Sequence, residues 1–112
     1  MESTRQHKVA RQLQKDVSDI FLKEGAEFVH GAMVSVTKVR ISPDLAVAKV
    51  YLSVFPFDKA EEILQRLTTH TSAVRRALGT RVRSQLRIVP ELLFYIDDSL
   101  EYVENIERLL KD

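Results

Sequence analysis

The chain has 112 residues, with 17 Lys and Arg against 16 Asp and Glu, 45% hydrophobic residues and no Cys. This composition predicts one domain, residues 1–112, with a core of its own, and it excludes a disulfide-stapled secreted scaffold and cysteine-based metal sites. Because the longest uncharged run, residues 28–37, is about half a membrane helix and no signal peptide precedes it, we expect a cytoplasmic protein without a membrane partner.

The first predicted element is a helix over residues 3–24, which Gly25 ends. Its apolar stripe consists of Val9, Leu13, Val17, Ile20 and Phe21. The bases in its first half are Arg5, Lys8, Arg11 and Lys15. Positive charge near a helix N-terminus opposes the helix dipole at about 0.3 to 1 kcal/mol for each residue. An anionic partner would explain this placement, and a solvated basic face is the alternative.

Residues 33–55 follow a period of two and predict an antiparallel hairpin. A phase slip at Thr37 and Lys38 indicates a β-bulge, and residues 42–45 form the turn. The inward face of the second strand contains Ala46, Ala48, Val50, Leu52 and Val54. The opposite face contains Val47, Tyr51 and Phe55. We attribute these apolar residues to partial cover by a neighbouring segment rather than to a binding surface.

Two helices follow Pro56. Asp58 and Glu61 predict a capping box for the first of them. Residues 68–72 are poor helix formers, so we expect a kink or joint there, followed by a second helix over residues 73–84. Its inward residues are Val74, Leu78 and Val82.

The last part predicts a strand within residues 86–96, with Pro90 at its start or on a sheet edge. The residues that alternate along this strand and so share one face are Ile88, Pro90, Leu92, Phe94 and Ile96. Asp98 or Ser99 then caps a final helix. The order is helix, strand, strand, helix, helix, strand, helix, which predicts an α+β fold with a three-stranded sheet covered by helices.

Charge is separated along the chain. Residues 63–90 contain no acid, and their bases are Arg66, Arg75, Arg76, Arg81, Arg83 and Arg87, whereas residues 91–112 carry a net charge of −5. At ~100° per residue, Arg76 and Arg83 lie within ~20° of each other, opposite the apolar stripe of their helix. Arginine binds phosphate through two parallel hydrogen bonds and stacks on bases, which favours a nucleic-acid partner. Ion pairs with the acidic final helix are the alternative.

Evidence for catalysis is weak. Gly25, Gly31 and Gly79 are too far apart for a phosphate-binding loop, and the three His residues are too far apart for a helical zinc pair. Asp97 and Asp98 have no third metal ligand beside them, so we favour helix capping over a hydrolase site. For His70 we also favour capping over phosphate binding. We therefore expect no enzyme activity, cofactor, metal or small-molecule substrate.

Two motifs carry a family resemblance. They are the strand pair with its Ser42-x-Asp44-Leu45 turn and the Arg87-x-x-Pro90-Glu91-Leu92 entry to the third strand. Together with Val34, Val36, Val39, Ile41, Ala48, Val50, Phe94, Asp97, Ile106 and Leu109, they resemble the ribosome-binding factor A family over nearly the whole chain. The Gly-x-x-Gly loop with which KH domains bind single strands is missing, so no residue is carried over from it.

The resemblance implies a type II KH-like fold without catalytic activity or cofactor. It implies binding to the immature 30S small ribosomal subunit, at 16S rRNA near the 5′ end and the neck and decoding region. It also implies a role in late 16S rRNA maturation and in growth in the cold.

From the charges and the resemblance together we predict RNA-binding residues Arg5, Lys8, Arg11, Lys15, Arg75, Arg76, Arg81, Arg83 and Arg87, in a protein that acts as a monomer. The alternative function is a basic protein–protein interaction module of KH-like fold without a specific role at rRNA.

Overall fold

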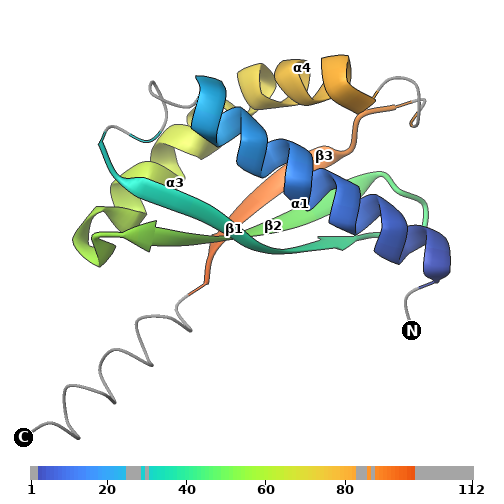
Figure 1. Ribbon diagram of the computed structural model, residues 1–112, viewed down its shortest axis with the longest axis horizontal. Coiled ribbons are helices and arrows are strands. Elements are labelled where there is room, and N and C mark those ends of the chain that lie inside the picture. The colour runs from blue at the N-terminus through green and yellow to red at the C-terminus, as the bar shows by residue number, and fades with distance from the viewer. Residues whose placement is uncertain (1–2, 25–28, 30, 83–85, 87, 98–112) are drawn as a thin grey trace, which may run out of the picture.

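The computed structural model describes residues 3–24, 29, 31–82, 86 and 88–97, which form helices packed on one face of a three-stranded sheet (Figure 1). The elements in chain order are α1 (Thr4–Glu24), β1 (Met33–Ile41), β2 (Val47–Phe55), the 3-10 turn η1 (Phe57–Lys59), α3 (Ala60–Thr69), α4 (Thr71–Val82) and β3 (Glu91–Ile96). This is the predicted α+β order of a type II KH-like fold. Gly25, as the end of the first helix, and the predicted final helix both lie outside the described residues.

The sheet has the order β1-β2-β3, with β1 and β2 antiparallel and β2 and β3 parallel. The hairpin is confirmed, and so is the bulge, because the β1–β2 register shifts between Val36 and Lys38. The Thr37 hydroxyl at this bulge donates to the Asp97 carboxylate at 2.7 Å and lies 3.3 Å from the Tyr51 carbonyl oxygen. The bulge is therefore tied to β2 and to the residue after β3.

The hairpin turn at residues 42–45 is organised by its own side chains. The Ser42 hydroxyl accepts hydrogen bonds from the N–H groups of Ala46 and Val47 and donates to the Asp44 carboxylate at 2.6 Å. These bonds, first that from Ser42 and then that from the Ala46 N–H, lower the pKa of Asp44. They also hold Leu45 at a φ of 62°, a left-handed conformation that few residues other than glycine adopt.

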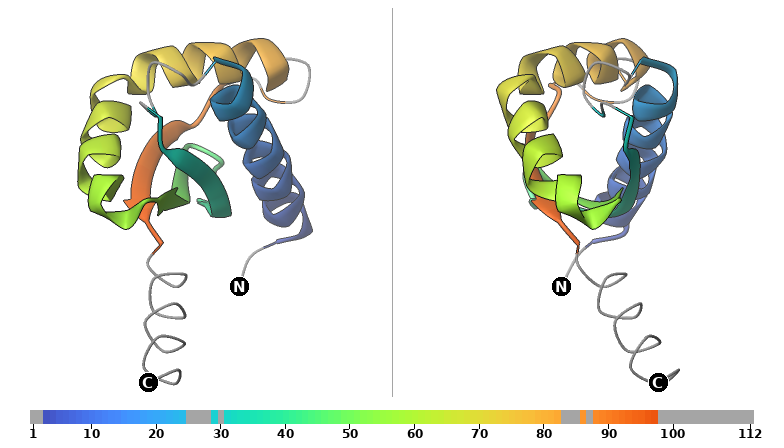
Figure 2. Two further views of the ribbon diagram at one scale, coloured as in Figure 1. Left: turned by 60° about the vertical axis from the view of Figure 1, so that its left-hand side comes forward. Right: turned by 90° about the vertical axis from the view of Figure 1, so that its left-hand side faces the viewer.

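The core lies between the helices and one face of the sheet. From α1, Leu13, Val17 and Ile20 are fully buried, as the predicted stripe requires. The sheet contributes Ala48, Val50, Leu52, Val54, Leu92 and Phe94, and α3 and α4 contribute Ile63, Leu67, Val74, Leu78 and Val82. Figure 2 shows α1, α3 and α4 as an arch over this face. On the opposite face, which we call the outer sheet face, no described helix packs.

The start of α1 is fixed by a capping box that the sequence analysis did not identify. The Gln6 N–H donates to the Ser3 hydroxyl at 3.1 Å, and the Ser3 N–H donates to the Gln6 side-chain oxygen at 2.8 Å. The Gln6 amide nitrogen also donates to the Ile41 carbonyl at 3.0 Å. Gln6, which is only 7% exposed, thus connects the first turn of α1 to the end of β1.

Two predictions around Pro56 and the helix joint are wrong in detail. The Asp58–Glu61 capping box does not form, because Asp58 lies inside η1 and the residue before α3, Lys59, caps it without a side-chain hydrogen bond. The joint is the single residue His70, and α4 begins at Thr71 rather than Ala73. The Thr71 hydroxyl donates to carbonyls at the end of α3, which satisfies part of that helix end.

The third strand is shorter than predicted. It begins at Glu91, directly after buried Pro90, so Ile88, which is 76% exposed, lies before the strand. Pro90 has no N–H to donate, and the carbonyls of Val89 and Pro90 accept hydrogen bonds from Arg75. Residues before Glu91 therefore cannot extend the ladder. Ala46 is likewise exposed and precedes β2 rather than belonging to its inward face.

We expect Gln6→Ala to lower the free energy of unfolding by about 2 kcal/mol, because it removes the acceptor of the Ser3 N–H in the capping box and leaves the Ile41 carbonyl without this donor. The measurement is urea unfolding followed by circular dichroism. The control is Gln12→Ala, whose side chain bonds only within α1, to Asp16. An equal loss in both variants would contradict the assigned role of Gln6.

Candidate nucleic-acid interface

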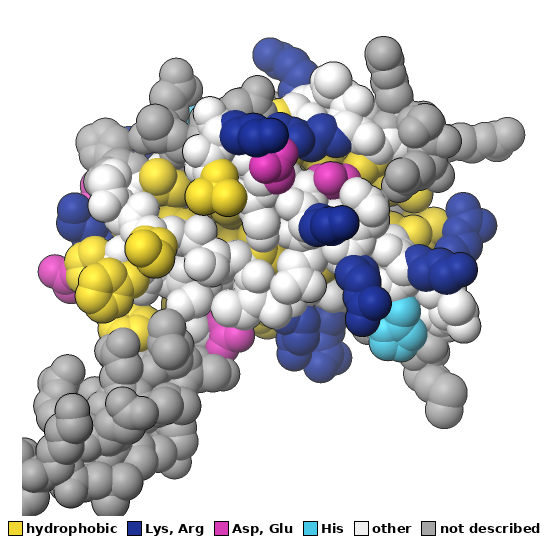
Figure 3. Space-filling view, viewed as in Figure 1, with side chains coloured by type: hydrophobic (Ala, Val, Ile, Leu, Met, Phe, Trp, Pro, Cys, Tyr) yellow, Lys and Arg dark blue, Asp and Glu magenta, His cyan; other side chains and the backbone are white. Residues whose placement is uncertain are grey.

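The strongest concentration of positive charge follows from the way α1 packs. Because its apolar stripe faces the sheet, the four bases of its first half project to solvent within about 120° of arc. We call Arg5, Lys8, Arg11 and Lys15 the α1 basic surface; all four are exposed. The first turn of α1 contains no acid. Figure 3 shows Lys and Arg side chains gathered over this half of the helix.

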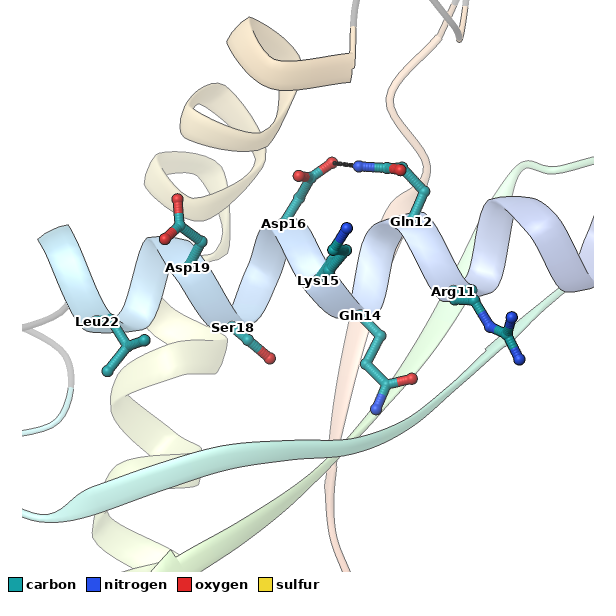
Figure 4. A pocket seen from close by; sticks show the side chains of 8 residues that line it. All are labelled: Arg11, Gln12, Gln14, Lys15, Asp16, Ser18, Asp19 and Leu22. Carbon is teal, nitrogen blue, oxygen red and sulfur yellow. Dashed lines mark hydrogen bonds between the residues drawn. The ribbon is translucent and has the colours of Figure 1, made fainter.

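The side chains beside the α1 basic surface are polar and held in place. Gln12 donates to the Asp16 carboxylate at 3.0 Å on one side, and Gln14 reaches the Val36 carbonyl at 3.3 Å on the other (Figure 4). Arg11 and Lys15 lie between these two directions, along a shallow hollow of about 560 Å³. None of the acids in the described part of the chain forms an ion pair with these bases. Repulsion between like charges at this spacing favours an anionic ligand.

A second hollow opens where α1 meets the end of α4. It has a volume of about 210 Å³, with Arg5 and Lys8 on the α1 side and Val82 and Leu86 on the other. Its lining combines apolar walls with two cations, an arrangement that can hold the sugar and phosphate groups of a nucleic acid. A neighbouring hollow of about 290 Å³ is lined by His7, Lys8 and Arg11, among others.

Arg75 and Arg81, both predicted RNA-binding residues, are engaged within the protein. The Arg75 guanidinium donates to the Val89 carbonyl at 2.8 Å and to the Pro90 carbonyl at 3.1 Å. This places Arg75 as a connection between α4 and the entry to β3. Arg81 donates to the Asp19 carboxylate at 2.6 Å and so joins α4 to α1.

The ionisation of Asp19 depends on this contact. Partial burial works against the charged carboxylate, but hydrogen bonds and positive charge from Arg81 and Lys23 outweigh it and lower the pKa of Asp19. The Lys23 ammonium lies 3.4 Å from the same carboxylate oxygen. The proposed alternative for the arginines, ion pairing, therefore applies to Arg81, whose described partner Asp19 is on α1. The predicted final helix lies outside the described residues.

Arg76 is exposed on the side of α4 opposite its buried stripe, as the helical geometry predicts. Arg83 and Arg87 lie outside the described residues. The structure thus brings the α1 basic surface together on one helix face and leaves Arg76 available on α4. Arg75 connects α4 to the β3 entry, and Arg81 connects α4 to α1.

The other candidate residues have local structural partners. The His70 Nδ1 donates to the Arg66 carbonyl at 2.8 Å, which confirms the expected capping of α3. Asp97 accepts a hydrogen bond from Thr37, and Asp98 lies outside the described residues. Among residues that the structure describes, no three metal-binding side chains come together, and no helix has the length and apolar character of a membrane span.

The sequence analysis missed three cations on the outer sheet face, Lys38, Arg40 and Lys49. Their alternation with buried residues along β1 and β2 was the available signal. The cover by a neighbouring segment expected over Val47, Tyr51 and Phe55 is not found among the described residues: Phe55 is 54% exposed, and Tyr51 contacts the side chains of Lys38 and Tyr95 on the adjacent strands.

Comparison with known proteins gives one consistent family. Residues 5–110 match the family model described as Ribosome-binding factor A. The ribosome-binding factor A of Cytophaga hutchinsonii is 46% identical over 110 residues, which cover 98% of this chain and 83% of the relative.

Solved structures of ribosome-binding factor A proteins have the same fold as this chain. The crystal structure of ribosome-binding factor A from Thermus thermophilus gives a TM-score of 0.69 at 24% identity, covering 81% of this chain and 94% of that one. A homology model of Thermus thermophilus ribosome binding factor A, fitted into the cryo-electron-microscopy map of its 30S complex, gives a TM-score of 0.60 at 27% identity, covering 80% of this chain and 91% of that one.

Arg75 and Arg76 are adjacent, but we expect replacement of Arg75 to lower stability and replacement of Arg76 to leave it nearly unchanged. Arg75→Ala should lower the free energy of unfolding by about 1.5 to 3 kcal/mol, because two carbonyls lose a charged donor. Arg76→Ala should change it by no more than about 0.5 kcal/mol, as is usual for an exposed side chain. Urea unfolding of both variants measures this, and similar losses would contradict the assignment.

The lowered pKa of Asp19 predicts a pH-dependent contribution to stability. A carboxylate with a lowered pKa in the folded state stabilises above its ordinary value of 3.8, and this contribution is lost as the pH falls through the lowered value. Asp19→Asn should therefore be less stable than the unmodified protein at neutral pH and nearly equal to it in strong acid. Asp16→Asn controls for loss of a carboxylate on α1. A stability difference for Asp19→Asn that does not shrink in acid would contradict the ion pair.

Proposed function

The chain belongs to the ribosome-binding factor A family, and from this membership we propose that it binds the free 30S small ribosomal subunit before that subunit is mature. The Thermus thermophilus relative has been placed in a 30S complex, which supports this proposal. Its contact region is 16S rRNA near the 5′ end and the neck and decoding region, and its role is in late 16S rRNA maturation. Such a partner fixes the place of action in the cytoplasm.

The observation that carries the proposal is the α1 basic surface. Four exposed cations lie on one side of a helix that the core holds rigidly, and the described acids leave them unpaired. Cations held at fixed spacing bind phosphates and position a protein on folded RNA without reading its sequence. Arg76 adds a further phosphate contact from α4. The sequence also predicts that Arg83 and Arg87, which lie outside the described residues, bind RNA.

Binding acts by selection between RNA states rather than by catalysis. A ligand shifts an equilibrium only by its differential affinity for the two states, so the protein must bind the immature arrangement of 16S rRNA more tightly than the mature one. It leaves when the mature contacts form. No bond is made or broken in this mechanism, and it requires no cofactor. One copy of the chain, acting as a single domain, is sufficient, and the need for such assistance is greatest in the cold.

The test is co-sedimentation with free small subunits at about 50 mM and about 200 mM salt. The double variant Lys8→Gln/Arg11→Gln should bind about tenfold more weakly, and its salt slope should fall by about two, because two phosphate contacts are lost. A matched control, Lys23→Gln/Lys59→Gln, removes the same charge away from the α1 basic surface.

Equal weakening in both double variants would show that only total charge matters and would contradict the proposed surface. If the unmodified protein does not co-sediment with free small subunits but binds an acidic protein, the result favours the alternative, a protein–protein interaction module.

A further inference from the structure

The outer sheet face carries a row of side chains that the proposed helical interface does not use. Tyr51 of β2 stacks against Tyr95 of β3, with ring centroids 5.5 Å apart and planes 26° apart. The Lys38 ammonium of β1 lies 5.1 Å from the Tyr51 centroid. Because β1 and β3 flank β2 on opposite sides, Lys38 and Tyr95 lie against Tyr51 from opposite sides. Tyr95 is on the edge strand and is 40% exposed, so part of its side chain is accessible to solvent.

Positive charge continues from this row toward the hairpin turn. Arg40 and Lys49 are register partners on β1 and β2, and both are exposed. They line a hollow of about 320 Å³ together with Val47. Lys49 is two residues from Tyr51, about 7 Å along the strand, which one nucleotide can span. On the described part of β3 and directly after it, Glu91 is the first residue of the strand and Asp97 follows its last residue, where Asp97 accepts a hydrogen bond from Thr37.

We propose that the outer sheet face binds a single-stranded segment of RNA, with one base stacked on Tyr95 and the adjoining phosphates at Lys38, Arg40 and Lys49. Aromatic rings stack on any base, and cations beside them follow the backbone, so this combination suits unpaired RNA with little sequence preference. A duplex keeps its bases inside and cannot offer one to Tyr95. The inference rests on the proposed function, since it gives the protein a second rRNA contact, opposite the helices.

The arrangement gives the two surfaces different tasks. The α1 basic surface binds phosphates of folded RNA by position, whereas the outer sheet face takes a strand that is not yet paired. Immature RNA offers both features, and pairing of the strand during maturation removes the second. Loss of this contact would then contribute to release.

The test uses a fluorescein-labelled oligouridine of about ten nucleotides and fluorescence anisotropy. Tyr95→Leu should weaken binding about tenfold, whereas Tyr95→Phe, which keeps the ring, should stay within about twofold of the unmodified protein. Lys38→Gln/Lys49→Gln, at exposed positions where folding is not at risk, should weaken binding and flatten its salt dependence. The Tyr95 ring signals in nuclear magnetic resonance should shift with oligouridine but not with an RNA duplex of about 16 base pairs.

The proposal is overturned if the unmodified protein does not bind oligouridine, or if Tyr95→Leu and Lys38→Gln/Lys49→Gln bind it unchanged. Capture of a protein by this face in place of oligouridine would also overturn it. Co-sedimentation with small subunits separates the two hypotheses. Retained sedimentation without oligouridine binding rejects only the sheet site, and retained Tyr95 shifts without sedimentation reject only the small-subunit role.

Discussion

The burial of one face of α1 against the sheet is the constraint on which the surface of this protein depends. Leu13, Val17 and Ile20 are fully buried, so the rotation of the helix about its axis is fixed. The bases at the other side must then face solvent, where their mutual repulsion makes a polyanion a favourable ligand. Gln6 fixes the position of α1 along its axis, because its side-chain hydrogen bond to the Ile41 carbonyl holds the first turn of α1 at the end of β1. Core packing thus determines the position of the charged surface.

Cations with similar sequence surroundings have different roles in the folded chain. Arg75 and Arg81 connect α4 to the β3 entry and to α1, while Arg76 is exposed between them. Without the first two contacts, α4 would lose polar links to its neighbours, and the end of α4 would be held less firmly beside α1. In the proposed interface, Arg75 and Arg81 therefore act indirectly, by holding in place the elements that carry the exposed cations.

Periodicity predicted most of the fold because each element buries one regular face. The stripe of α1, the slip at Thr37 and the buried face of β2 all follow from spacing alone. The start of β3 could not be predicted, since it depends on Arg75 reaching carbonyls 14 and 15 residues away. The partners of Arg75 and Arg81 are also distant in sequence, so the sequence alone could not distinguish these two structural residues from the exposed Arg76. It identified the α1 basic surface, where helical spacing suffices, and overlooked the row from Lys38 to Tyr95, which pairing of three strands assembles.

In the proposed complex with the free small subunit, the α1 basic surface faces 16S rRNA. A cryo-electron-microscopy reconstruction of that complex would locate this surface. We expect rRNA phosphates beside Lys8, Arg11 and Lys15, with the face of α3 that carries Glu61 and Glu62 turned away from RNA. A complex in which α1 points to solvent, or contacts only ribosomal protein, would contradict it.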